Sequence, residues 1–75
     1  MIDKKIPGKM LVGKYCRTTR AIRNRAGHEI AEGEICRIDR CIKGHGLIKI
    51  THIPQEPQMH VVSIVNVSRQ DLELI

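Results

Sequence analysis

Arginine and lysine side chains are the most frequent groups in this 75-residue chain that could bind a charged ligand. Thirteen Lys and Arg outnumber eight Asp and Glu and give a formal net charge of +5, which favours phosphate-rich or acidic partners. Seven of these cations fall within one part of the sequence: Arg17, Arg20, Arg23, Arg25, Arg37, Arg40 and Lys43. Because guanidinium groups bind phosphates bidentately, we predict that these residues contact nucleic-acid phosphates with little sequence specificity.

Three of the arginines show the alternation expected for side chains on one face of an antiparallel sheet. Arg17 and Arg23 have the same parity, and Arg37 on a neighbouring strand could align with them. A ladder of guanidinium groups would then form a track for phosphates. The alternative is an ordinary solvated basic face, partly balanced by four acids: Glu29, Glu32, Glu34 and Asp39.

Cysteine and histidine side chains could bind a metal ion, but their spacing argues against it. Structural zinc sites usually include two cysteines separated by about two to four residues. Cys36 and Cys41 have this spacing, yet they have opposite parity on one predicted strand, so their sulfur atoms should point apart. We therefore predict no metal ion and no cofactor, and we assign Cys36 to the core.

Catalysis and membrane insertion have little support in the sequence. No short motif places a thiol or hydroxyl beside a base and an orienting group, and a domain this small has little room for a substrate cavity. No segment approaches the roughly 20 apolar residues of a membrane span, and the odd number of cysteines favours free thiols in a reducing compartment. We predict a cytoplasmic protein without enzymatic activity.

The elements that carry the cations are predicted to be β-strands and turns. Residues 13–23 are rich in Thr, Ile and Cys and lack the apolar spacing of a helix, which predicts a first strand. Residues 24–33 contain Gly27 and Gly33 on either side of an isolated Ile30. This composition is typical of a long turn that directs one side chain into the core.

A β-hairpin is predicted from the next two segments. Within residues 34–43, three apolar side chains share one parity and should face the core: Cys36, Ile38 and Ile42. Glycines on both sides of His45 predict a tight turn, so residues 47–52 should return antiparallel. The expected orientations alternate, with Ile48 and Ile50 towards the core and Lys49 and Thr51 towards solvent.

The C-terminal part is predicted to contain a loop, a strand, one helical turn and a short last strand. Pro54 and Pro57 mark the loop, and residues 59–67 form a β-branched run that is typical of a strand. Ser68 should cap a single turn of helix over residues 68–71.

The order of these elements resembles that of an SH3-like barrel and is also similar to KOW-type barrels near residues 33–42. The resemblance rests on glycines at bends, one turn residue and the C-terminal turn: Gly27, Ile30, Gly33, Gly44, Gly46 and residues 68–72. It implies an all-β fold in which residues 11–75 form a partly open five-stranded barrel after a flexible extension at residues 1–10. SH3 domains that bind proline-rich peptides use several aromatic rings, whereas Tyr15 is the only aromatic residue here.

A second hypothesis is that the protein is an accessory or assembly subunit. A small barrel leaves edge strands that another protein can extend by β-augmentation. The predicted loop also places apolar residues next to prolines, which makes it a candidate docking segment: Ile53, Pro54, Pro57 and Met59. Binding to nucleic acid that weakens steeply with salt would favour the phosphate-binding hypothesis over this one.

Overall fold

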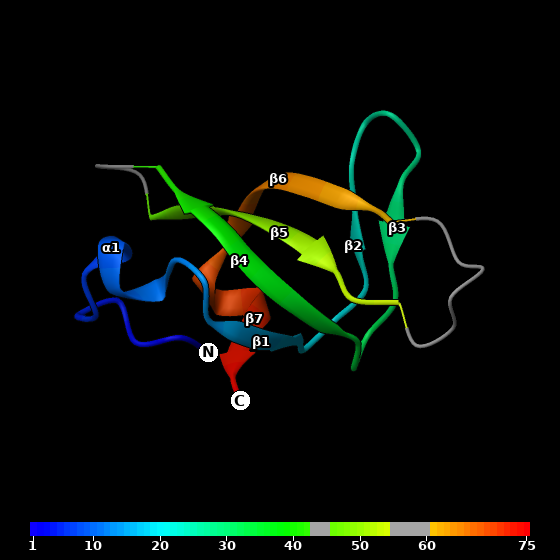
Figure 1. The fold of residues 1–75 in the computed structure, drawn as a ribbon. Coiled ribbons are helices and arrows are strands. Elements are labelled where there is room, and N and C mark those ends of the chain that lie inside the picture. Colours follow the sequence, from blue (N-terminus) through cyan, green and yellow to red (C-terminus); the bar gives the residue numbers. More distant parts are fainter. Residues whose placement is uncertain (43–45, 55–60) are drawn as a thin grey trace.

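Most of the regular secondary structure is β-strand in the computed structural model, which describes residues 1–42, 46–54 and 61–75 (Figure 1). Within these residues the elements follow in this order: α1 (Gly8–Leu11), β1 (Tyr15–Thr18), β2 (Ile22–Arg23), β3 (Glu29–Ile30), β4 (Ile35–Cys41), β5 (Leu47–His52), β6 (Ser63–Ser68), the 3₁₀ turn η1 (Arg69–Asp71) and β7 (Leu72–Leu74). The predicted all-β class is confirmed.

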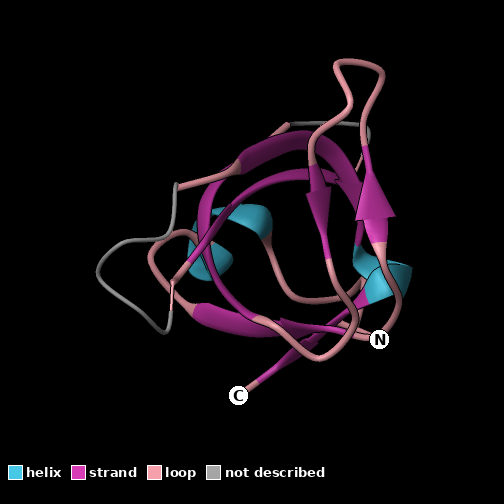
Figure 2. Cartoon of the chain, turned by 90° about the vertical axis from the view of Figure 1, so that its right-hand side faces the viewer, coloured by secondary structure: helices cyan, strands magenta, loops and turns pink. Residues whose placement is uncertain are grey.

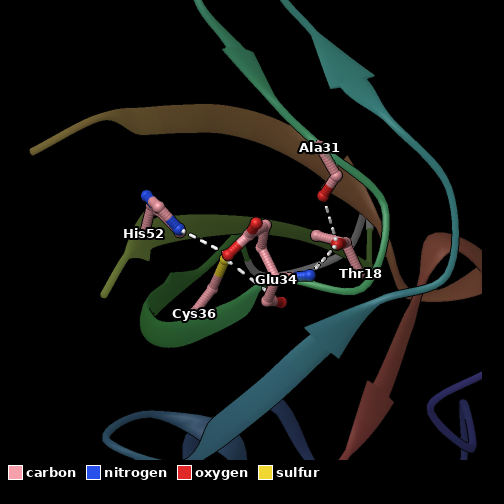
Figure 3. A network of polar contacts seen from close by, with 5 residues as sticks. All are labelled: Thr18, Ala31, Glu34, Cys36 and His52. Carbon is pink, nitrogen blue, oxygen red and sulfur yellow. Dashed lines mark hydrogen bonds and ion pairs between the residues drawn. The ribbon is translucent and has the colours of Figure 1, made fainter. Parts of the chain in front are cut away.

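Five of the strands form one antiparallel sheet in the order β6-β5-β4-β1-β7. β2 and β3 form a separate hairpin, which projects beyond the curled sheet (Figure 2). The predicted first strand is therefore divided, because β1 ends at Thr18 and β2 begins at Ile22. The Thr18 hydroxyl donates to the carbonyl of Ala31 (2.7 Å) and accepts from the N–H of Glu34 (3.0 Å), which joins the base of the hairpin to the sheet (Figure 3).

One apolar core lies inside the curled sheet. Its buried side chains are aliphatic or thiol groups: Ile2, Leu11, Cys16, Ile22, Ile30, Cys36, Ile38, Ile48, Ile50, Ile64, Val67 and Leu72. The prediction that the long turn directs Ile30 into the core is confirmed, and so are the inward orientations predicted for Cys36, Ile38, Ile48 and Ile50.

A β-bulge reverses the predicted orientation of side chains at the end of β4. The register with β5 shifts between Ile38 and Arg40, so Asp39 is the extra residue. Cys41 consequently packs against the core, whereas Ile42, which was predicted to face inward, is 37% exposed. An extra residue inverts the alternation of every side chain that follows it, and this inversion also places Arg40 in solvent.

The first ten residues, for which we predicted a flexible extension, pack against the sheet in the structure. Ile2 is only 2% exposed, and its N–H donates to the carbonyl of Arg69 (3.0 Å). The Nη1 atom of Arg69 donates in turn to the carbonyls of Asp3 (2.8 Å) and Ile6 (2.7 Å). Burial of Ile2 and Leu11 removes apolar surface from water, which explains why this segment is part of the folded unit.

The remaining predictions have mixed outcomes. Thr51 belongs to the outer face as predicted, but it is 8% exposed because Asp39 and Ser63 form hydrogen bonds with its hydroxyl. The predicted C-terminal turn is confirmed, since the Ser68 hydroxyl accepts from the N–H of Gln70 (3.1 Å) at the start of η1. Most of the predicted tight turn at residues 44–46 lies outside the described residues.

Candidate functional site

A basic groove lies between the β2–β3 hairpin and β6. It consists of two cavities of about 660 and 180 Å³ that share Arg23, Val65 and Asn66 among their lining residues. Arg25 lines the larger cavity and Arg20 the smaller one. Three of the seven predicted cations therefore line these two adjoining cavities.

The hairpin holds its arginines in solvent because two isoleucines anchor it. Ile22 and Ile30 are cross-strand partners and both are buried, so the residues that alternate with them point outward. At the tip, the Asn24 side chain accepts from the N–H of His28 (2.9 Å), and Gly27 adopts a φ of +88° that favours glycine. These contacts define the wall of the groove that carries Arg23 and Arg25.

The opposite wall is formed by a second β-bulge, in the edge strand β6. Ile48 pairs with Val67 and Ile50 with Ile64, so the bulge residues Val65 and Asn66 together face one residue of β5. Asn66 has a φ of +62° and is exposed, and Val65 is 55% exposed. Bulges often reorient side chains next to functional sites, and here the bulge presents an amide and an apolar group to the groove.

Two of the groove arginines lie beside acids. Arg23 Nη2 is 3.0 Å from a carboxylate oxygen of Glu29, its cross-strand partner, and Arg20 Nη1 is 3.8 Å from Asp71. Both arginine side chains remain at least 70% exposed, and ion pairs of such exposed side chains contribute little to stability. Arg25 makes no ion pair with any residue in the described part of the chain. The three cations are therefore accessible to an anionic ligand.

The predicted ladder of Arg17, Arg23 and Arg37 is not formed. Arg23 belongs to the separate hairpin, whereas Arg17 and Arg37 are diagonal neighbours on the outer face of the sheet. Arg37 lies opposite Tyr15, whose ring is exposed, and Arg17 lies opposite Glu73 of β7. The division of the first strand separates side chains that an unbroken strand would have aligned.

Arg37 is part of a polar network on this outer face. Its Nε atom donates to Asp39 (2.8 Å), and the Thr51 hydroxyl donates to the other carboxylate oxygen. Burial alone would raise the pKa of Asp39, but the hydrogen bonds from Thr51 and Arg37 outweigh it and lower the pKa below its usual value. The carboxylate is therefore ionised and well compensated at neutral pH.

The other predicted site residues lie elsewhere. Arg40 borders a different cavity near α1, and Lys43 lies outside the described residues. Among the candidate docking residues, Ile53 and Pro54 are half-buried, and the N–H of Ile53 donates to the carbonyl of Ile35 (2.9 Å). Pro57 and Met59 are not among the residues that the structure describes.

The buried cysteines are poor nucleophiles. Burial raises the pKa of Cys16 to about 12 and that of Cys36 to about 11, so both thiols are protonated at neutral pH. Near Cys36, His52 Nε2 lies 3.0 Å from the carboxylate of Glu34, and the thiol donates to the Glu34 carbonyl (Figure 3). Over residues 1–42, 46–54 and 61–75, no three His, Cys, Asp or Glu side chains are placed to hold one metal ion.

Sequence reasoning missed the groove because its second wall depends on the bulge at Val65 and Asn66. The β-branched run that predicted β6 is interrupted by Asn66, and asparagine tolerates a positive φ better than most residues. Asn66 was therefore the one local signal in the sequence that β6 is irregular at this position.

The comparisons with known proteins found no match. No protein-family model matches the chain, and no match was found among curated proteins or among solved structures. Among the described residues, no helix has the length and apolar character needed to span a membrane.

Proposed function

We propose that the protein is a small SH3-like, non-enzymatic binding module that acts in the cytoplasm. The order of neighbouring strands, the projecting β2–β3 hairpin and the 3₁₀ turn before β7 support the SH3-like architecture. The sheet keeps two edges, β6 and β7, which fits a partly open barrel. All three cysteines are free thiols, and this supports a reducing compartment.

The ligand that we propose for this module is the phosphate backbone of a nucleic acid. The observation that carries the proposal is the groove in which Arg20, Arg23 and Arg25 line hollows opposite the bulge of β6. Three arginines outnumber the one acid, Asp71, among the residues that line these cavities, and a concave surface with an excess of one sign of charge attracts ions of the opposite sign. Arginines bind phosphate oxygens without reading the sequence, so binding is weakly specific.

The bulge gives this groove groups that could contact the remainder of a nucleotide. The Asn66 amide can donate and accept hydrogen bonds, and Val65 offers apolar surface next to it. The groove has no aromatic lining residue among those described, so it lacks the stacking platform that strengthens many single-strand binders. Electrostatic attraction therefore dominates the proposed affinity.

The test compares two pairs of arginines that carry equal charge on different surfaces. Binding of mixed-sequence RNA and DNA is measured at several salt concentrations for the wild type and for Arg20→Ala/Arg25→Ala. We expect this variant to bind more weakly, with a log–log salt slope that is shallower by about one unit for each lost phosphate contact. The matched control is Arg17→Ala/Arg37→Ala on the outer sheet face, which should keep most of the affinity.

Two results would contradict the proposal. Equal losses in the two double variants would mean that net charge alone attracts nucleic acid and that the groove has no particular role. Absence of salt-sensitive binding at micromolar protein would exclude phosphate contact altogether.

The edge strand β6 supports a second candidate function, docking on another protein. β6 forms one edge of the five-stranded sheet, and both Val65 and the preceding Val61 are more than half exposed. A partner strand could add to such an edge by β-augmentation. If this is the function, Val65→Lys should abolish capture of a specific partner from native extract, and Arg20→Ala/Arg25→Ala should leave that capture intact.

A further inference from the structure

A separate cavity of about 620 Å³ lies between α1 and the end of β4. It shares no lining residue with the hairpin groove, and α1 lies at the far end of β4 from the hairpin (Figure 1). The N-terminal segment contributes residues 7–9 and Val12, and the opposite wall comes from residues 39–42 and Arg69. Its volume is within the range of about 300–1,000 Å³ that is typical of small-molecule sites.

The walls of this cavity are held in place by a close approach of α1 to β4. A Cβ atom on Gly8 would lie 2.8 Å from the Cβ of Cys41, so glycine is needed for the two elements to touch. The N–H of Gly13 also donates to the carbonyl of Ile38 (2.8 Å). The cavity is therefore bounded by fixed backbone on both sides.

Three cations surround the cavity: Lys9, Arg40 and Arg69. None of them forms an ion pair with a described residue. Arg69 is half-buried, and its hydrogen bonds to the described residues go only to backbone carbonyls, which do not neutralise its charge. Its Nε atom is buried and makes no hydrogen bond to the described residues, although buried polar atoms normally have a partner.

The acid that lines the cavity does not supply the missing counter-charge. Both carboxylate oxygens of Asp39 are engaged, one by Arg37 and the other by Thr51. The rest of the lining is largely apolar, and Val12 and Ile42 expose much of their side chains to solvent there. The three cations therefore lack an acidic partner among the described residues, and exposed apolar side chains lie beside them. A ligand that carries a negative charge and an apolar group would complement both features.

We propose that this cavity binds an organic anion composed of a carboxylate or phosphate head group and an apolar body. The head group accepts hydrogen bonds from Arg40 and Lys9 at the rim and lies in the field of Arg69. The apolar body covers Val12 and Ile42 and so removes their surface from water. This site does not depend on the proposed nucleic-acid function, because it uses a different cavity and different cations.

Cys41 provides a reporter for occupancy of this cavity. It is the half-buried cysteine and lines the cavity wall, whereas Cys16 and Cys36 are fully buried. Modification by iodoacetamide, a neutral reagent, should therefore occur first at Cys41. A ligand that fills the cavity slows this reaction in proportion to the fraction of protein occupied.

The probes are hexanoate and hexyl phosphate, with hexylamine and inorganic phosphate as controls. We expect at least one of the two organic anions to protect Cys41 and to shift the NMR signals of residues 8–12 and 39–42, and their relative affinities identify the preferred head group. Hexylamine should do neither, because it brings a like charge to the cations. Equal protection by hexylamine, no protection by either anion, or equal binding of inorganic phosphate and hexyl phosphate would overturn the proposal.

Variants of Lys9 and Arg40 test which charges hold the ligand. Both residues are exposed, so their replacement should not disturb the fold. Lys9→Gln/Arg40→Gln should weaken binding of the protecting anion by about a hundredfold, as expected for loss of two charge-assisted hydrogen bonds at about tenfold each. Arg20→Gln/Arg25→Gln, in the hairpin groove, removes the same net charge and should leave this affinity unchanged. Equal losses in the two variants would refute a specific site between α1 and β4.

Discussion

The hairpin groove and the cavity beside α1 are both basic, but they hold their cations in different ways. In the groove, Arg23 and Arg20 lie next to acids and remain largely exposed. In the cavity, Arg69 is half-buried and binds the backbone carbonyls of Asp3 and Ile6. The first arrangement leaves guanidinium groups free to exchange partners, whereas the second uses a guanidinium group to join two ends of the chain.

This difference separates a cation that stabilises the fold from cations that are exposed and could bind a ligand. An exposed ion pair contributes little to stability, so an arginine in the groove can be removed at small cost to the fold. A half-buried charge that donates to carbonyls is costly to remove, because its acceptors lose their partners. A basic surface patch and a basic structural clamp therefore look alike in composition and differ in burial.

The largest expected effect is the loss of stability caused by Arg69→Met. Methionine keeps much of the apolar volume but removes the hydrogen bonds to Asp3 and Ile6. We expect the free energy of unfolding to fall by about 2 to 3 kcal/mol, in line with hydrogen bonds that involve a charged group. Urea denaturation followed by circular dichroism measures this change.

Arg25→Met is the matched control for this substitution. Arg25 is exposed at the tip of the hairpin and forms no ion pair within the described residues, so its replacement should change stability by less than about 0.5 kcal/mol. Similar stabilities for the two variants would show that Arg69 does not clamp the N-terminal segment.

The second prediction concerns the acid sensitivity of the network at the edge of the α1 cavity. The pKa of Asp39 is lowered in the folded protein, so its ionised form stabilises the fold above its unfolded pKa. This stabilisation is lost as the pH falls through the lower folded pKa. Asp39→Asn should cost about 1 to 2 kcal/mol at neutral pH, as for a hydrogen-bonded charged group.

The pH dependence distinguishes this explanation from a simple packing defect. The wild type should lose more stability than Asp39→Asn between about pH 5 and pH 2, because the variant has no carboxylate to protonate. Parallel stability curves for the two proteins over this range would contradict a role for the ionised carboxylate. The same variant should also bind hexanoate more tightly, since it removes a negative charge from the cavity wall.

Much of the fold could be predicted from local patterns of the sequence. Alternation identified the inward residues of β4 and β5 up to Ile38, and glycine positions located the long turn around Ile30. The C-terminal turn followed from the capping side chain of Ser68. These features depend on neighbouring residues, so a single sequence contains the information needed to find them.

The two hollows could not be predicted, because both depend on bulges and on contacts between distant segments. The bulge at Asp39 turned Ile42 outward and Cys41 inward, and the bulge at Val65 and Asn66 formed one wall of the groove. Contact between Ile2 and Arg69 joins residues at opposite ends of the chain. The alternation of apolar and polar residues predicts side-chain orientation only in a regular strand. It does not show where a bulge inserts an extra residue.

The smallest expected effect is the change in stability of Glu29→Gln, and it tests the groove directly. Glu29 lies beside Arg23, with an N–O distance of 3.0 Å, in an exposed pair. Loss of such a pair should lower stability by less than about 0.5 kcal/mol. If the groove binds phosphates, however, the substitution frees Arg23 for the ligand, so affinity should rise and the log–log salt slope should steepen by up to about one unit.

Glu73→Gln, opposite Arg17 on the outer face, is the matched control. An equal gain of affinity in both variants would indicate a general effect of net charge, whereas a gain confined to Glu29→Gln would assign the phosphate contact to the hairpin.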